Sequence, residues 1–266
     1  EQLKKCGVEY FDFYLLHNVN EHSMGYYGNP ENKYLDYFLE QKANGRIKHL
    51  GFSCHSAADG LEQFLQMCGD KMEFCQIQLN YLDWTLQNAK KKCEILKAHG
   101  PERAFVLNGC PTDMVRDDIQ AVIDAADCSF PVAWMNTAGY CGSMRRGFMD
   151  AMCFLAGQMP RPESRNEEPS VNLVGLSPDD YLGEADAEAI RRMLEPEVRL
   201  NAVLPMLDEA GMRRFGRARL NLVFRGFEPV GEALKRALGM DYLVVDYPYG
   251  AAGSEAFLRE VDAALD

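Results

Sequence analysis

A change of composition near Gly100–Pro101 divides this chain into two parts. Residues 1–100 contain ten Lys and one Arg, whereas residues 101–266 contain one Lys and sixteen Arg. Alanine rises from five residues to twenty-one across the same point. Folding does not demand such a change, because both cations serve on a solvated surface, whereas different coding histories produce it readily. The break therefore predicts two pieces of separate origin, at residues 1–100 and 101–266.

Strand-like apolar runs alternate with helical patterns in the first part, which is typical of βα units and a parallel sheet. We expect three strands and three helices, with the strands at 11–17, 47–53 and 74–81 and the helices at 32–45, 57–69 and 86–100. The first part is thus predicted to hold three βα units.

The second part repeats the alternation with other spacings, so a second parallel α/β region is expected. Its predicted strands lie at 104–108, 131–136, 171–176, 198–203, 219–224 and 242–246. Its predicted helices lie at 113–127, 143–157, 184–194, 228–239 and 254–265. Residues 158–170 are rich in Pro and charge and poor in apolar residues, which indicates a loop or linker.

Charge and cysteine content exclude several classes of protein. The net charge of −12 disfavours a nucleic-acid partner, since phosphate binding needs a basic surface. The sequence contains no apolar run of about 18 residues, so no membrane span is expected. Nine cysteines without a CxxC pair, and a start without a signal-peptide pattern, predict reduced thiols in a cytoplasmic protein.

Three motifs in the first part, GVEYFDFYLLHNVN, GRIKHLGFSCH and FCQIQLNYLDW, resemble the aldo-keto reductase family in order and spacing. The resemblance covers residues 1–99 and implies part of an eight-fold (β/α) barrel that reduces carbonyls with NADPH. It implies that His17 is the active-site histidine and that Ser53 and Gln76 bind the nicotinamide carboxamide. Functional groups of such barrels lie at the C-terminal ends of strands, where these residues are expected.

The resemblance also shows what the first part lacks. The family's proton donor is a tyrosine made more acidic by a lysine, and both belong to strands preceding FDFYLLH. Those strands, and the ones that follow QIQLNY in the family, have no counterpart in this chain. We therefore expect an unclosed barrel piece with two apolar strand edges and an incomplete NADPH site.

The second part resembles the nitrogenase component 1 type oxidoreductases, on the segments PERAFVLNGCPTDMVRDDIQAVIDAA and FPVAWMNTAGYCGSMRRGFMDAM and on the pattern after them. This family has Rossmann-like parallel-sheet domains that hold iron–sulfur clusters. The motif CPTDMVRDD places Cys110 at the position of a cluster-ligating cysteine. A cysteine that follows a strand and starts a helix has its thiolate favoured by the helix dipole, and iron needs that thiolate.

One cysteine does not hold a cluster. The family takes further cysteines from upstream sequence, which in this chain is the barrel piece. Cys128, Cys141 and Cys153 match no ligand position, and we interpret them as buried hydrophobes. A homodimer or a partner subunit would have to complete the site, and an electron-donor protein would be a further partner.

Three functional hypotheses stay open at this point. In the first, both parts are oxidoreductase fragments, joined naturally or by recombination or assembly error, with neither active site complete. In the second, residues 101–266 form a working iron–sulfur redox region with a partner. In the third, the chain is a non-enzymatic scaffold or interaction protein. Activity as a carbonyl reductase would require the missing barrel segments from elsewhere, so whether the chain is an enzyme stays undecided.

Overall fold

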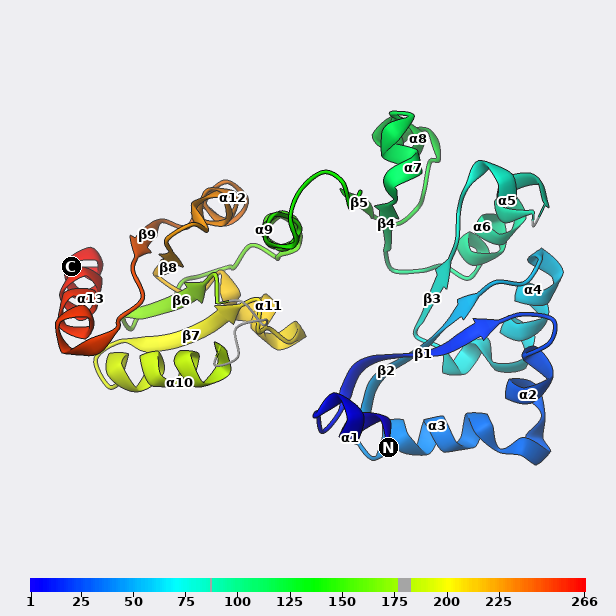
Figure 1. Cartoon of the computed structure of the whole chain (residues 1–266), viewed down its shortest axis with the longest axis horizontal. Helices are drawn as coiled ribbons and strands as arrows, with labels where there is room; N and C mark the ends of the chain where they lie inside the picture. Colours follow the sequence, from blue (N-terminus) through cyan, green and yellow to red (C-terminus); the bar gives the residue numbers. More distant parts are fainter. Residues whose placement is uncertain (87, 177–182) are drawn as a thin grey trace. The chain divides into compact units, whose positions relative to one another are not determined.

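The computed structural model describes residues 1–86, 88–176 and 183–266 (Figure 1). The chain divides into two compact units, one of residues 1–104 and 123–132 and the other of residues 105–122 and 133–266. Both contain α/β structure, and the three- and four-stranded sheets are parallel. The predicted fold class is therefore confirmed.

The first unit contains a parallel sheet of order β1-β2-β3. Its strands are β1 (Phe11–Val19), β2 (Ile47–Cys54) and β3 (Phe74–Ile77). The helices of the three predicted βα units are α3 (Tyr34–Ala43), α4 (Ala58–Cys68) and α6 (Ala89–Ala98). Short helices that the sequence did not predict are α1 (Gln2–Cys6), α2 (Met24–Gly28) and α5 (Tyr81–Leu86). Residue 87, at the start of the third predicted helix, lies outside the described residues.

Helices cover only one face of this sheet with apolar contacts. Leu16, Leu50 and Phe52 are at most 1% exposed, and the ring of Phe52 lies 4.6 Å from that of Phe64 in α4. On the opposite face, Phe13 is 65% exposed and its ring stacks on His49 at 5.0 Å. Among the described residues, this face of the sheet therefore has no helix packed on it through buried apolar side chains.

A two-stranded sheet of β4 (Ala104–Asn108) and β5 (Val132–Asn136) follows. The sequence predicted one helix at 113–127, and this prediction is wrong. Two short helices are present instead, α7 (Cys110–Met114) and α8 (Ile119–Ala125). Arg116 lies between them with a φ of 58°, a left-handed conformation that a continuous helix does not allow.

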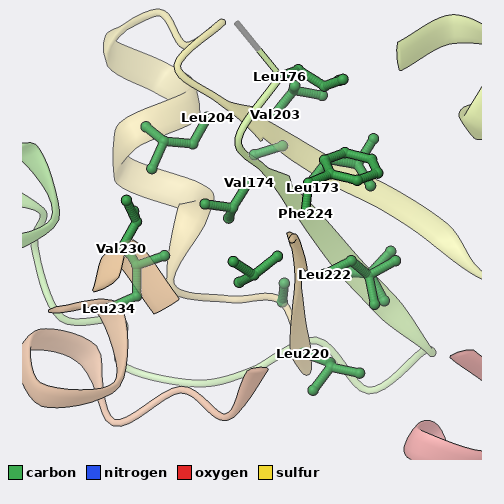
Figure 2. Close-up of a cluster of buried hydrophobic side chains, with 14 of the residues drawn as sticks. Leu173, Val174, Leu176, Val203, Leu204, Leu220, Leu222, Phe224, Val230 and Leu234 are labelled. Atoms are coloured by element: carbon green, nitrogen blue, oxygen red, sulfur yellow. The ribbon is translucent and has the colours of Figure 1, made fainter. Parts of the chain in front are cut away.

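The second unit contains a parallel sheet of order β7-β6-β8-β9. Its strands are β6 (Ser170–Val174), β7 (Arg199–Leu204), β8 (Leu220–Phe224) and β9 (Tyr242–Val245). Its helices are α9 (Met144–Gln158), α10 (Gly183–Leu194), α11 (Glu209–Phe215), α12 (Glu228–Leu238) and α13 (Gly250–Leu265), of which α11 was not predicted. Both β6 and β8 are buried along their whole length, which is typical of strands covered on both faces. Figure 2 shows apolar side chains of these two strands together with Val230 and Leu234 of α12.

Three buried asparagines cross the centre of this sheet. Asn201 Nδ2 donates to Asn172 Oδ1 at 2.7 Å, and Asn172 Nδ2 donates to Asn221 Oδ1 at 2.9 Å. Asn172 Nδ2 also donates to the carbonyl of Phe215, where α11 ends. Asn172 and Asn221 are register partners, whereas Asn201 lies where the register between β6 and β7 shifts. Since buried amides destabilise a core unless they are paired, this row joins β7, β6 and β8 by side-chain hydrogen bonds.

The predicted loop at 158–170 has no helix or strand between the end of α9 at Gln158 and the start of β6 at Ser170, and arginine side chains fasten it to the rest of the second unit. Arg165 donates to the carbonyls of Ala218 at 2.9 Å and Gly239 at 2.8 Å. Arg161 Nε donates to the carbonyl of Ala237 at 2.9 Å, near the end of α12. The loop is therefore a packed connection and not a free linker. No helix among the described residues combines the length and hydrophobicity that crossing a bilayer requires.

Candidate functional site

The residues that the sequence singled out in the first unit lie at the carboxyl ends of adjacent strands. His17 is exposed near the end of β1, while its neighbour Leu16 is buried on the helix-covered face. Ser53 and Gln76 are register partners across β2 and β3, so their side chains share one face of the sheet. The structure therefore brings the three residues to one edge of the sheet, away from its apolar core.

The surroundings of these residues hold them in place. Ser53 is 5% exposed, and its Oγ accepts a hydrogen bond from the backbone N–H of Asn18 at 2.9 Å. The hydroxyl of Tyr27 donates to the carbonyl of His17 at 3.1 Å. Burial raises the pKa of Tyr27, so this phenol stays protonated over the neutral range.

Cys110 begins α7, two residues after β4 ends at Asn108. Its position directly after a strand and at the start of a helix agrees with the sequence prediction. Gly139, in the loop after β5, donates its backbone N–H to Cys110 Sγ at 3.2 Å. Thr137 in the same loop donates its N–H to Asn108 Oδ1 at 2.9 Å. The loop is therefore hydrogen-bonded both to the last residue of β4 and to the thiol of Cys110.

Asp113, one turn beyond Cys110, is the centre of a polar cluster. The hydroxyl of Tyr140 donates to Asp113 Oδ2, and Asn136 Nδ2 donates to Oδ1 at 2.5 Å. The Tyr140 hydrogen bond lowers the pKa of Asp113, and the carboxylate in turn raises the pKa of Tyr140 to about 12. Asp113 is therefore a carboxylate at neutral pH and Tyr140 is a neutral phenol.

Cys141 corrects one sequence prediction, because it is exposed and not buried. Its thiol donates to Asp113 Oδ2 at 3.5 Å. Partial desolvation is the main cause that raises the pKa of Cys141, and the Asp113 carboxylate adds to it. Cys128 and Cys153, also predicted to be buried, are partly exposed.

Sequence reasoning missed Asp113, Tyr140 and Asn136 as neighbours of Cys110. The signal that was available is their position, since Asn136 ends β5 and Tyr140 lies in the glycine-containing loop after it. The carboxyl ends of neighbouring parallel strands meet at one edge of a sheet, where ligands bind. The sequence did not show how far this loop folds back over Cys110.

A metal centre needs several converging ligands, and the part of the chain that the structure describes does not provide them alone. The described residues contain no group of three or more His, Cys, Asp or Glu that is placed to hold a metal ion. An iron–sulfur cluster takes four ligands, usually cysteine thiolates. Cys110 and Cys141 are described thiols near this loop, so the described residues of one copy do not fit a complete cluster.

Comparison with known families assigns both parts of the chain. The family model described as nitrogenase component 1 type oxidoreductase matches residues 91–266, well over half of the chain. The chain belongs to this family. The aldo/keto reductase family model matches residues 1–101, so the resemblances stated from the motifs are both confirmed. The chain is an oxidoreductase-related protein built from these two pieces.

Curated relatives of this family member match at low identity. A subunit of the light-independent protochlorophyllide reductase from Synechococcus sp. (strain JA-3-3Ab) is 26% identical over 42% of this chain and 22% of its own length. The corresponding subunit from Jannaschia sp. (strain CCS1) is 23% identical over 60% of this chain and 32% of its own length. The chain therefore spans less than a third of the length of these relatives.

Two solved structures that are described as nitrogenases match this chain. The structure described as Nitrogenase Cp1 at pH 6.5 matches with a TM-score of 0.50 and 13% identity, over 80% of this chain and 53% of that chain. The structure described as Nitrogenase Cp1 at pH 5 matches with a TM-score of 0.44 and 20% identity, over 70% of this chain and 42% of that chain. The first of these similarities supports the Rossmann-like α/β fold of the second part, and no more than the fold.

Proposed function

We propose that residues 101–266 act as an electron-transfer region of the nitrogenase component 1 type, in which Cys110 supplies one ligand to an iron–sulfur cluster shared with another chain. The observation that supports this is the place of Cys110 at the carboxyl end of β4, with the N–H of Gly139 directed at its sulfur. Such N–H···S hydrogen bonds stabilise a thiolate and tune the potential of a cluster that it holds.

The remaining ligands would come from a second copy or a partner subunit, because the described residues of one chain offer too few. The loop after β5 would form the protein wall beside the cluster, and Tyr140 and Asn136 would hold the Asp113 carboxylate by hydrogen bonds. Both curated relatives are named as subunits of a reductase, which supports a multi-subunit assembly fed by an electron-donor protein. Residues 1–100 and 101–266 would then be the two functional parts of the chain.

The experiment is anaerobic reconstitution of the full chain with iron and sulfide, followed by iron and sulfide analysis and absorbance near 400 nm. A Cys110→Ala variant is expected to lose the bound iron, whereas a Cys128→Ala variant is expected to keep it. Cys128 is a suitable control because it is also partly exposed but lies outside the loop that contacts Cys110. Equal iron in the wild type and the Cys110→Ala variant would refute the assignment.

We propose a second, weaker activity for the barrel piece, namely contact with the nicotinamide of NADPH through Ser53 and Gln76, with His17 beside the substrate carbonyl. The shared edge of the sheet on which the three residues lie supports it. Carbonyl reduction also needs a proton donor, which these three residues do not include, so binding and not turnover is the quantity to measure. Titration with NADPH fluorescence tests this, and a Gln76→Ala variant should weaken any binding seen.

A non-enzymatic scaffold is the alternative to both proposals. It predicts a folded chain that retains neither iron nor NADPH in these two experiments. The two assays therefore separate a working iron–sulfur region or an NADPH-binding barrel piece from a chain that binds neither group, without an identified substrate.

A further inference from the structure

An open groove of about 530 Å³ lies between α9 and α12 in the second unit. Cys153 and Gly157 of α9 line one wall, and Ala233 and Ala237 of α12 line the other. In each pair the residues are four positions apart, so both project from one face of their helix. Because three of these four residues are Gly or Ala, the packed helices leave open space along this line.

Two guanidinium groups border the groove. Arg161 is held in place by the hydrogen bond from its Nε to the carbonyl of Ala237, which leaves the terminal nitrogens of its guanidinium group as donors. Arg236 projects from the last turn of α12. Among the described residues, no carboxylate lies within ion-pair distance of either Arg161 or Arg236, although the second part of the chain carries a net charge of −10.

The nearby acidic group does not neutralise them. Burial is the main cause that raises the pKa of the Cys153 thiol, and the nearby Asp150 carboxylate raises it further. Asp150 itself forms an ion pair with Arg146 at 2.8 Å. The charges of Arg236 and Arg146 act to lower the pKa of the same thiol. The groove is therefore a locally cationic surface on an acidic protein, with a partly buried thiol in its wall.

We propose that this groove binds a small anionic molecule whose carboxylate or phosphate group pairs with Arg161 and Arg236. Guanidinium groups bind both kinds of anion through paired N–H donors, and the apolar lining residues Ala233, Ala237 and Met159 accommodate a short carbon skeleton. The site involves neither Cys110 nor the strand ends of the first unit, so it is independent of the function proposed above.

Cys153 provides a direct measurement of the local charge. Iodoacetate and iodoacetamide alkylate a thiolate by the same reaction, in which sulfur bonds to carbon and iodide leaves, and they differ only in the carboxylate. The rate of alkylation of Cys153 by iodoacetate is divided by the rate with iodoacetamide, and both are followed by peptide mass spectrometry on the reduced full chain. Because a nearby cation favours the anionic reagent, this ratio is expected to fall about two- to fivefold in an Arg236→Gln variant. An Arg192→Gln variant is the matched control, because Arg192 is an exposed arginine on α10 that pairs with Glu188.

Ligand binding is measured in parallel by calorimetric titration with inorganic pyrophosphate and with citrate. Either anion should bind the wild type and the Arg192→Gln variant and lose affinity for the Arg236→Gln variant; the stronger of the two identifies the phosphate or the carboxylate class. Binding should also slow iodoacetamide labelling of Cys153 but not that of Cys128. The proposal is overturned if neither anion binds, or if binding is the same in the Arg236→Gln variant.

Discussion

Replacement of Asn172 by alanine is expected to destabilise the second unit more than any single loss at its surface. Asn172 is fully buried and its side chain takes part in three hydrogen bonds, with Phe215, Asn221 and Asn201. Each contributes about 1 kcal/mol net to stability, and a partner left buried without a bond costs up to about 3 kcal/mol.

The partners respond differently to the loss, and this sets the magnitude. Asn201 Nδ2 keeps its contacts with the carbonyls of Arg214 at 3.2 Å and Phe215 at 3.4 Å. Asn221 Oδ1 loses the donor that Asn172 supplied, inside a core that excludes water. The free energy of unfolding of this unit should therefore fall by about 3–4 kcal/mol.

Hydrogen exchange detected by mass spectrometry measures this locally, which matters because the chain has two compact units. Amides of β6 that exchange through unfolding should exchange several hundredfold faster, by about two to three orders of magnitude, in the Asn172→Ala variant. Asn166→Ala is the control, since Asn166 is half-buried and its side chain donates one hydrogen bond, to Ser170 Oγ at 3.1 Å. Equal acceleration in the two variants would refute the argument that the buried asparagine row holds the sheet together.

Two other expectations follow from single side chains. An Arg165→Ala variant loses the hydrogen bonds from Arg165 that fasten the 158–170 loop. Limited proteolysis should therefore cut this loop about tenfold faster than in the wild type. An unchanged cutting rate would show that other contacts hold the loop. Burial raises the pKa of Glu73, but the Lys42 ammonium at 2.5 Å and the Leu50 N–H at 3.0 Å outweigh it and lower the pKa to about 2. Because the folded-state pKa is depressed, this stabilisation is present above about pH 4.5 and is lost as the pH falls through about 2. The difference in Tm between the wild type and a Glu73→Gln variant should shrink over that range, and a difference that is constant with pH would contradict the ion pair.

Prediction from sequence succeeded where a pattern is local. The apolar run of β6 and the periodic pattern of α12 correspond to the elements that form, with ends that differ by one or two residues. It failed where one residue leaves the regular conformation, as at Arg116, whose left-handed backbone splits the helix expected at 113–127. It also missed the short helices α2 and α11, because a helix of five or seven residues has too few turns to show a period.

The candidate sites show the same division. The motifs placed His17, Ser53 and Cys110 at strand ends, because order along the chain and strand polarity are properties of the sequence. Their neighbours were not predictable in this way. Asp113 and Tyr140 are 27 positions apart, and they meet because the loop after β5 folds back over α7.

The sequence by itself determined that the chain has two pieces of different composition, that each alternates strands with helices, and which families these pieces resemble. Those properties depend on residue type and on spacing along the chain. Only the tertiary structure brings Asn172, Asn201 and Asn221 together in one row. It alone also places a carboxylate in the loop region of Cys110 and two arginines at the border of one groove. Such features arise when residues far apart in the sequence pack together, and no local pattern encodes which of them will meet.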